Sequence, residues 1–76
     1  MKELLTYVAQ NLVEHPESVS VSETAGEGET VLELRVHPDD MGKVIGRQGR
    51  IAKEIRTLVR SVAQRKGTRV TVEIVD

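Results

Sequence analysis

The order in which helical and alternating apolar patterns follow one another most constrains how these 76 residues can fold. Apolar residues recur every three or four positions over residues 2–14, which predicts an amphipathic helix that ends before Pro16. Residues 17–24 and 30–37 alternate polar and apolar side chains on either side of a short turn that contains glycine. Two such segments around a short turn are typical of an antiparallel hairpin.

The second half of the chain returns to helical periodicity, which a glycine pair interrupts. We expect a short helix over residues 39–45, with Asp39 and Asp40 capping its first turn, and a longer helix over residues 50–65. Alternation over residues 70–74 predicts a last strand. The order α-β-β-α-α-β predicts a two-layer α+β fold, with a three-stranded sheet packed on three helices. The apolar residues expected to face the core from the two later helices are Met41, Val44, Ile45, Ile51, Ile55, Leu58 and Val62.

Charge is strongly segregated along the chain, although the net charge is only −1. Residues 1–40 carry a balance of −7, residues 41–66 carry +7, and the remaining residues carry −1. A basic block of this size favours contact with a polyanion, because clustered charges set the local potential whatever the total. A solvated helix face is the alternative explanation.

The sequence offers little to a catalyst, a cofactor or a metal ion. No nucleophile, base and orienting group stand together, so we do not expect an enzyme. His15 and His37 are 22 positions apart without supporting ligands, so ordinary histidines are expected rather than metal ligands. The chain has no cysteine, no apolar run long enough to span a bilayer and no signal-peptide pattern at its start. A non-catalytic protein without a cofactor, located in the cytoplasm, is the expectation.

The segment Gly46-Arg47-Gln48-Gly49 lies between the two later helices and inside the basic block. Glycine has no Cβ, so a ligand backbone can approach it closely. The segment also opens a helix whose N-terminus attracts anions, and Arg47 can pair with a phosphate group. A tight corner whose glycines serve only steric needs is the alternative.

Together with Ile45, Ile51 and Ile55, this segment resembles the KH domain, whose loop has the form Ile-Gly-x-x-Gly between two helices. The expected order of elements matches the type II arrangement, and residues 37–52 are similar to the small bacterial KH proteins of the KhpA/YlqC family.

The resemblance implies a single KH domain over residues 1–76 that binds RNA without catalysis. The loop would hold about four nucleotides of single-stranded RNA by their backbone. The implied RNA-binding residues are Lys43, Ile45, Gly46, Arg47, Gln48, Gly49, Arg50 and Lys53. The implied apolar floor of the groove comes from Val44, Ile45, Ile51 and Ile55.

The resemblance also implies partners. Family members self-associate or pair with a second bacterial KH protein of the Jag/EloR type, with a link to cell elongation and division. A dimerisation or adaptor module, with RNA binding secondary, therefore stays open as an alternative, and four valines without an evident inward place favour it: Val13, Val31, Val59 and Val75. Tyr7 is the only aromatic residue apart from the histidines, so we expect little sequence preference and affinity that falls with salt.

Overall fold

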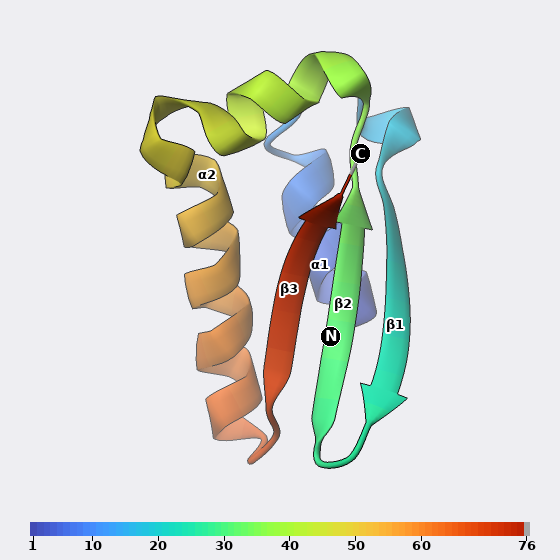
Figure 1. Ribbon diagram of the computed structural model, residues 1–76, viewed down its shortest axis with the longest axis vertical. Coiled ribbons are helices and arrows are strands. Elements are labelled where there is room, and N and C mark those ends of the chain that lie inside the picture. Colours follow the sequence, from blue (N-terminus) through green and yellow to red (C-terminus); the bar gives the residue numbers. More distant parts are fainter. Residues whose placement is uncertain (76) are drawn as a thin grey trace.

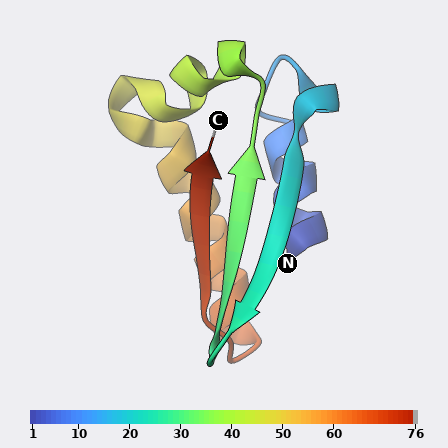
Figure 2. The ribbon, with the colours of Figure 1, turned by 45° about the vertical axis from the view of Figure 1, so that its right-hand side comes forward.

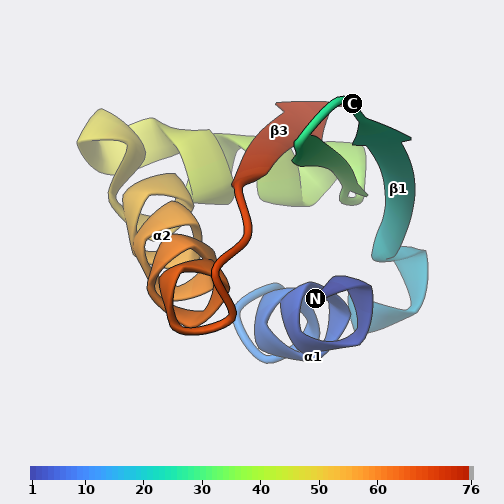
Figure 3. The ribbon, with the colours of Figure 1, turned by 90° about the horizontal axis from the view of Figure 1, so that it is seen from below.

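The computed structural model describes residues 1–75, except for the side chains of Arg47 and Gln48. Its elements in chain order are α1 (Lys2–Gln10), the 3₁₀-helix η1 (Pro16–Ser18), β1 (Ser20–Gly26), β2 (Glu29–Arg35), α2 (Pro38–Arg65) and β3 (Val70–Val75). The view from below shows α1 and the lower part of α2 on one side of the sheet (Figure 3). The predicted α+β fold, with the order of a type II KH domain, is confirmed.

The sheet places β2 between the other two strands. β1 pairs with β2 in antiparallel register, with Val21 opposite Leu34, and β3 pairs with β2 in parallel, with Val72 opposite Leu32 (Figure 2). A parallel pair needs a long crossover, and α2 supplies it. The inward side chains of the three strands, above all Leu32 and Leu34, form the centre of the core.

The first helix and the first strand are both shorter than predicted. α1 ends at Gln10 rather than at residue 14, and the side chain of Asn11 donates to the carbonyl oxygen of Tyr7 at 2.7 Å. Asparagine competes in this way with helical hydrogen bonds, which explains the early end. Pro16 then opens η1, which takes residues that we predicted as strand, so β1 begins at Ser20.

The two later helices are joined without a loop. Helical structure runs from Pro38 to Arg65, and the chain changes direction at Gly49, whose φ of 67° lies in the left-handed region (Figure 1). We call residues 38–48 the first arm and residues 50–65 the second arm. The predicted interruption over Gly46–Gly49 is therefore a bend at its last residue rather than an open loop.

The core of α2 differs from the predicted stripe. Ile45 is 50% exposed and Leu58 is 40% exposed, whereas Val59 is 1% exposed. The buried line of the second arm consists of Ala52, Ile55, Val59 and Ala63. Its spacing is as helical as that of the predicted line, so periodicity alone could not choose between two neighbouring stripes. Within the described residues, no helix is long and apolar enough to cross a bilayer.

Candidate functional site

The first turn of α2 is capped by a histidine. The backbone N–H of Asp39 donates to Nδ1 of His37 at 3.0 Å. The prediction that Asp39 and Asp40 cap the helix was wrong. Asp40 is 2% exposed, and its two carboxylate oxygens accept the backbone N–H groups of Glu14 at 3.1 Å and His15 at 3.0 Å. Asp40 therefore fastens the connection between α1 and η1 to the first arm.

This clamp depends on the charge of Asp40. Burial by itself raises the pKa of its carboxyl group, but the N–H donors of Glu14 and His15, together with the electrostatic attraction of the neighbouring His15 and His37, outweigh that effect. The pKa of Asp40 consequently lies below the ordinary value of 3.8. The group stays ionised at neutral pH, where it is the stronger acceptor.

The two histidines lie together, although they are 22 positions apart in the sequence. The rings of His15 and His37 stack with their centroids 4.1 Å apart. Asp39 Oδ2 lies 3.8 Å from His15 Nε2 and 3.7 Å from His37 Nδ1, so a possible ligand cluster exists that sequence spacing did not reveal. However, His37 Nδ1 already accepts the capping hydrogen bond, which competes with metal coordination at that atom. The stack packs the N-cap of α2 against the connection between α1 and η1.

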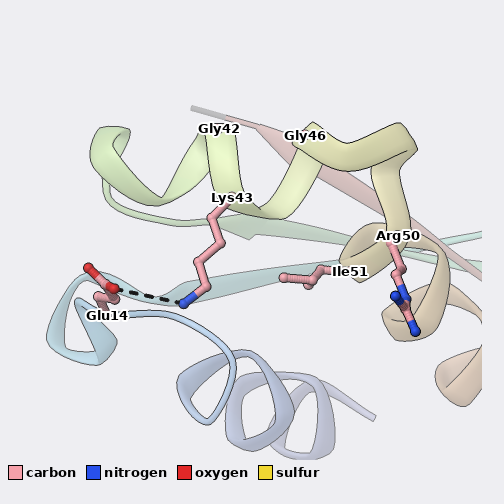
Figure 4. Close-up of a pocket in the computed structure, with 6 residues that line it drawn as sticks. All are labelled: Glu14, Gly42, Lys43, Gly46, Arg50 and Ile51. Carbon is pink, nitrogen blue, oxygen red and sulfur yellow. Dashed lines mark ion pairs between the residues drawn. The ribbon is translucent and has the colours of Figure 1, made fainter.

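A hollow of about 390 Å³ opens below the first arm, next to the bend (Figure 4). It is lined by Glu14, Gly42, Lys43, Gly46, Arg50 and Ile51. Lys43 points from the first arm towards Glu14 of the α1–η1 connection, with 3.9 Å between Lys43 Nζ and Glu14 Oε1. Ile51 points from the second arm towards Lys43, while Arg50, which also lines the hollow, points down along the second arm (Figure 4). The two arms of α2 and the distant α1–η1 connection thus surround one space.

The sequence left two explanations for the glycines of this region: close approach of a ligand backbone, or a tight corner whose glycines serve only steric needs. The structure separates these explanations residue by residue. Gly49 needs its missing side chain for the left-handed bend itself. A Cβ on Gly46 or Gly42 would meet no atom within 4 Å, and neither residue has a positive φ. Packing therefore does not require glycine at these two positions, and the space beside them stays open to a ligand.

The predicted site residues fall into separate groups. Lys43, Gly46 and Arg50 line the hollow, and Gly49 forms the bend beside it. Ile45 is exposed outside the hollow, and Lys53 lines a shallow hollow farther along the second arm. The predicted contacts of the Arg47 and Gln48 side chains lie outside the described part of the structure.

The predicted apolar floor is only partly correct. Val44 and Ile55 are buried in the core, at 0% and 1% exposure, so they cannot form a floor. Ile51 is half-buried and lines the hollow. Sequence reasoning missed Glu14 and Gly42. Glu14 gives no local signal, because it reaches the site only through the fold.

Arg50 has a second interaction on its own arm. Its Nε lies 3.5 Å from Glu54 Oε1, one helical turn along, and both side chains are largely exposed. Such a surface pair is weak, so Arg50 can leave it for a stronger anion.

Comparisons with known proteins agree with this architecture. The family model "KhpA/KhpB, KH domain" matches residues 2–74. The protein named RNA-binding protein KhpA from Clostridium acetobutylicum is 55% identical over 75 residues, which are 99% of this chain and 100% of that protein. The protein of the same name from Caldanaerobacter subterraneus is 51% identical over the same lengths.

A larger protein contains a similar fold. Era, solved in complex with MgGDPNP and nucleotides 1506–1542 of 16S ribosomal RNA, superposes with a TM-score of 0.68 and 25% identity. The match covers 96% of this chain and 28% of the Era chain, so this chain corresponds to little more than a quarter of Era. With the family model and the full-length relatives, these findings confirm the resemblance: the chain belongs to the KhpA/KhpB family of KH-domain proteins.

Proposed function

We propose that this protein is a non-catalytic RNA-binding protein that holds a short single-stranded RNA segment by its backbone at the bend Gly46–Gly49. Relatives at 55% identity are named RNA-binding proteins, which supports the ligand class. The observation that carries the proposal is the open space over Gly46 and Gly49 beside the cations Lys43 and Arg50. We further propose that residues 1–76 act as one KH domain in the cytoplasm.

The chemistry of the bend favours a sugar-phosphate strand. A strand can approach the main chain of Gly46 and Gly49 closely, because a Cβ there would fill space that is now empty. The second arm begins directly after the bend, so the positive end of its dipole lies at this point. Lys43, Arg47, Gln48, Arg50 and Lys53 supply the positive potential and the donors, and Ile45 offers an exposed apolar contact.

The test replaces Arg47 and Gln48 by aspartates in one double variant. Binding of a short single-stranded RNA should fall at least about 100-fold, because two polar contacts are lost and phosphates are repelled. The melting curve followed by circular dichroism should stay nearly unchanged. Mobility shift at low salt measures the binding.

The matched control adds the same negative charge elsewhere, through Lys2→Asp and Gln10→Asp on exposed positions of α1. This control should lose far less RNA affinity than the double variant at Arg47 and Gln48. If that double variant bound RNA as tightly as the parent, the assigned site would be wrong. If neither the parent nor the control bound RNA at low salt, the proposed function would be wrong.

A second candidate function, self-association or pairing with a second KH protein, is favoured by one observation. Leu58 is 40% exposed on the second arm, in a shallow hollow of about 420 Å³ that Thr57 and Ser61 also line. Val59, which the sequence suggested as an unplaced apolar residue, lies in the core and gives no such support. Lys53 and Glu54 complete the lining of this hollow, and the exposed Leu58 supplies its apolar contact for a protein partner.

Sedimentation of the uncharged variant Leu58→Gln tests this candidate, with Tyr7→Gln on exposed α1 as the control. Leu58→Gln should yield monomers while Tyr7→Gln behaves like the parent. Affinity for a short RNA should be unchanged, and affinity for a long RNA should fall through lost avidity. A parent protein that stays monomeric with and without RNA would contradict self-association.

A further inference from the structure

The hollow below the first arm contains a carboxylate that phosphate binding does not explain. Glu14 faces Lys43, and its side chain is 76% exposed, so the core does not need it. Beside a phosphate-binding bend, a carboxylate lowers the affinity for a polyanion. The position of Glu14 therefore fits a part of RNA other than phosphate.

Glu14 and Lys43 present complementary hydrogen-bonding groups side by side. The carboxylate only accepts, through two oxygens, and the ammonium only donates. The Watson–Crick edge of guanine carries two neighbouring donors, N1–H and the N2 amino group, followed by the acceptor O6. Guanine can donate both hydrogens to Glu14 and accept one from Lys43. Adenine and cytosine offer Glu14 only one donating group, and the single donor of uracil lies between two carbonyl oxygens that repel a carboxylate.

The hollow has the size and walls that a base needs. Its volume of about 390 Å³ lies within the usual range for small-ligand sites, roughly 300–1,000 Å³. Gly42 and Gly46 leave one wall without side chains, and half-buried Ile51 offers an apolar surface to the face of a ring. Stacking and apolar contact of this kind are common in the recognition of unpaired bases.

The pair is also ready to open for a ligand. Lys43 Nζ and Glu14 Oε1 are 3.9 Å apart, and both side chains are exposed, at 47% and 76%, so their mutual attraction is small. The backbone of Glu14 is fixed, since its N–H donates to buried Asp40. Because its main chain is fixed, Glu14 keeps its carboxylate near the hollow. Binding of a ligand would therefore cost little additional conformational entropy there.

We propose that this hollow binds a single guanine base of the RNA held at the bend, with Glu14 and Lys43 reading its Watson–Crick edge. The inference rests on the proposed RNA-binding function and adds a base preference to it. It also assigns the site to a base within a strand rather than to a free guanine nucleotide.

Fluorescence anisotropy with short uridine strands tests the proposal. The parent protein should bind a strand with one central guanine about tenfold more tightly than the all-uridine strand, the discrimination typical of a good bidentate contact. Strands with adenine or cytosine at that position should gain less. Inosine, which lacks the N2 amino group, should fall between guanine and uracil.

The Glu14→Gln variant should bind the guanine strand and the uridine strand within about twofold of each other, since an amide cannot accept both donors as a carboxylate does. Glu27→Gln in the exposed hairpin turn removes the same charge far from the hollow and should keep the parent's preference. Free guanosine monophosphate should compete only weakly, because the bend does not hold it by a strand.

The possible results separate this proposal from the one on which it rests. Clear binding of all strands with equal affinity would overturn the guanine site and leave RNA binding intact. A guanine preference that survives in Glu14→Gln would overturn the role of Glu14. Guanosine monophosphate that binds as tightly as the guanine strand would overturn the assignment to RNA. Failure of every strand to bind at low salt would overturn both proposals.

Discussion

Two turns at opposite ends of the molecule share one backbone conformation and differ in almost everything else (Figure 1). Gly49 at the bend of α2 has a φ of 67°, and Gly28 in the hairpin turn has a φ of 68°. Glu27 and Glu29 flank the hairpin glycine, whereas Arg50 follows the bend glycine and Lys43 lies nearby. A left-handed glycine thus makes a turn, and the neighbouring charges decide whether that turn can attract an anion.

The hollows beside the two turns also differ in the charges that line them. At the hairpin end, Gly28 shares a hollow with a second left-handed glycine, Gly67, and with Glu29 and Arg69, so charges of both signs meet there. The backbone N–H of Thr30 donates to the carbonyl oxygen of Arg69 at 2.9 Å. This hydrogen bond joins the hairpin turn at Gly28 to the turn at Gly67. At the loop end, the hollow beside the bend is flanked by two cations and one carboxylate. The hairpin end joins strands, whereas the end with the bend has open space over Gly46 and Gly49.

The largest effect on stability should come from a substitution that loosens the end of the molecule with the bend, while Gly28 and Gly49 stay unchanged. Asp40→Ala removes a buried carboxylate that accepts two backbone N–H groups, so these donors lose their partners and the α1–η1 connection comes loose. We expect the largest fall in melting temperature of all variants described for this end. Asp39→Ala, at an exposed neighbouring position, should change it little.

The same group makes the loop end sensitive to acid. The pKa of Asp40 is lower in the folded chain than in the unfolded chain, so the unfolded chain binds its proton more readily. The stability that Asp40 contributes is therefore present at neutral pH and is lost as the pH falls through 3.8 and below. Urea unfolding of the parent and of Asp40→Asn should differ at neutral pH and converge in acid. An equal difference at both pH values would show that charge has no part in the clamp.

Alanine at the three left-handed glycines should have an intermediate effect on stability. These variants separate the backbone conformation of a turn from the charges around it. Gly28→Ala, Gly49→Ala and Gly67→Ala each force alanine into a left-handed conformation, at a cost of about 1 kcal/mol. No added Cβ meets another atom within 4 Å, so the three losses should be similar, roughly 4–8 °C in melting temperature. Only Gly49→Ala should also weaken RNA binding, by roughly threefold to tenfold. Equal weakening by Gly28→Ala would remove the distinction between the two ends.

The smallest effect should come from releasing Arg50. Glu54→Gln removes its exposed partner on the second arm and should change the free energy of unfolding by at most about 0.5 kcal/mol. RNA affinity should rise slightly and fall more steeply with salt, because Arg50 becomes free to contact phosphate. Titrations at several salt concentrations measure this, with Glu27→Gln as the variant that should show no change. Weaker binding by Glu54→Gln would mean that the pair positions Arg50 instead of competing for it.

Sequence patterns predicted strands better than helical faces. Alternation puts Leu32, Leu34 and Val36 on one face of a strand, and the structure buries all three, because a strand has only two faces. A helix has several overlapping stripes, so Leu58 was predicted inside while Val59 took that place. The glycine segment was identified from its spacing and charge, although its form as a bend at Gly49 required the structure.

The sequence by itself determined the order of elements, the family and the basic glycine segment, since periodicity, spacing and charge are properties of neighbouring residues. Only the tertiary structure decided which distant groups meet: Glu14 with Lys43, Asp40 with the backbone of Glu14 and His15, and His15 with His37. These pairs are separated by more than twenty positions, and no local pattern joins them. Folding α1 and α2 onto one side of the sheet brings them together, so the chemistry of the hollow is a result of packing.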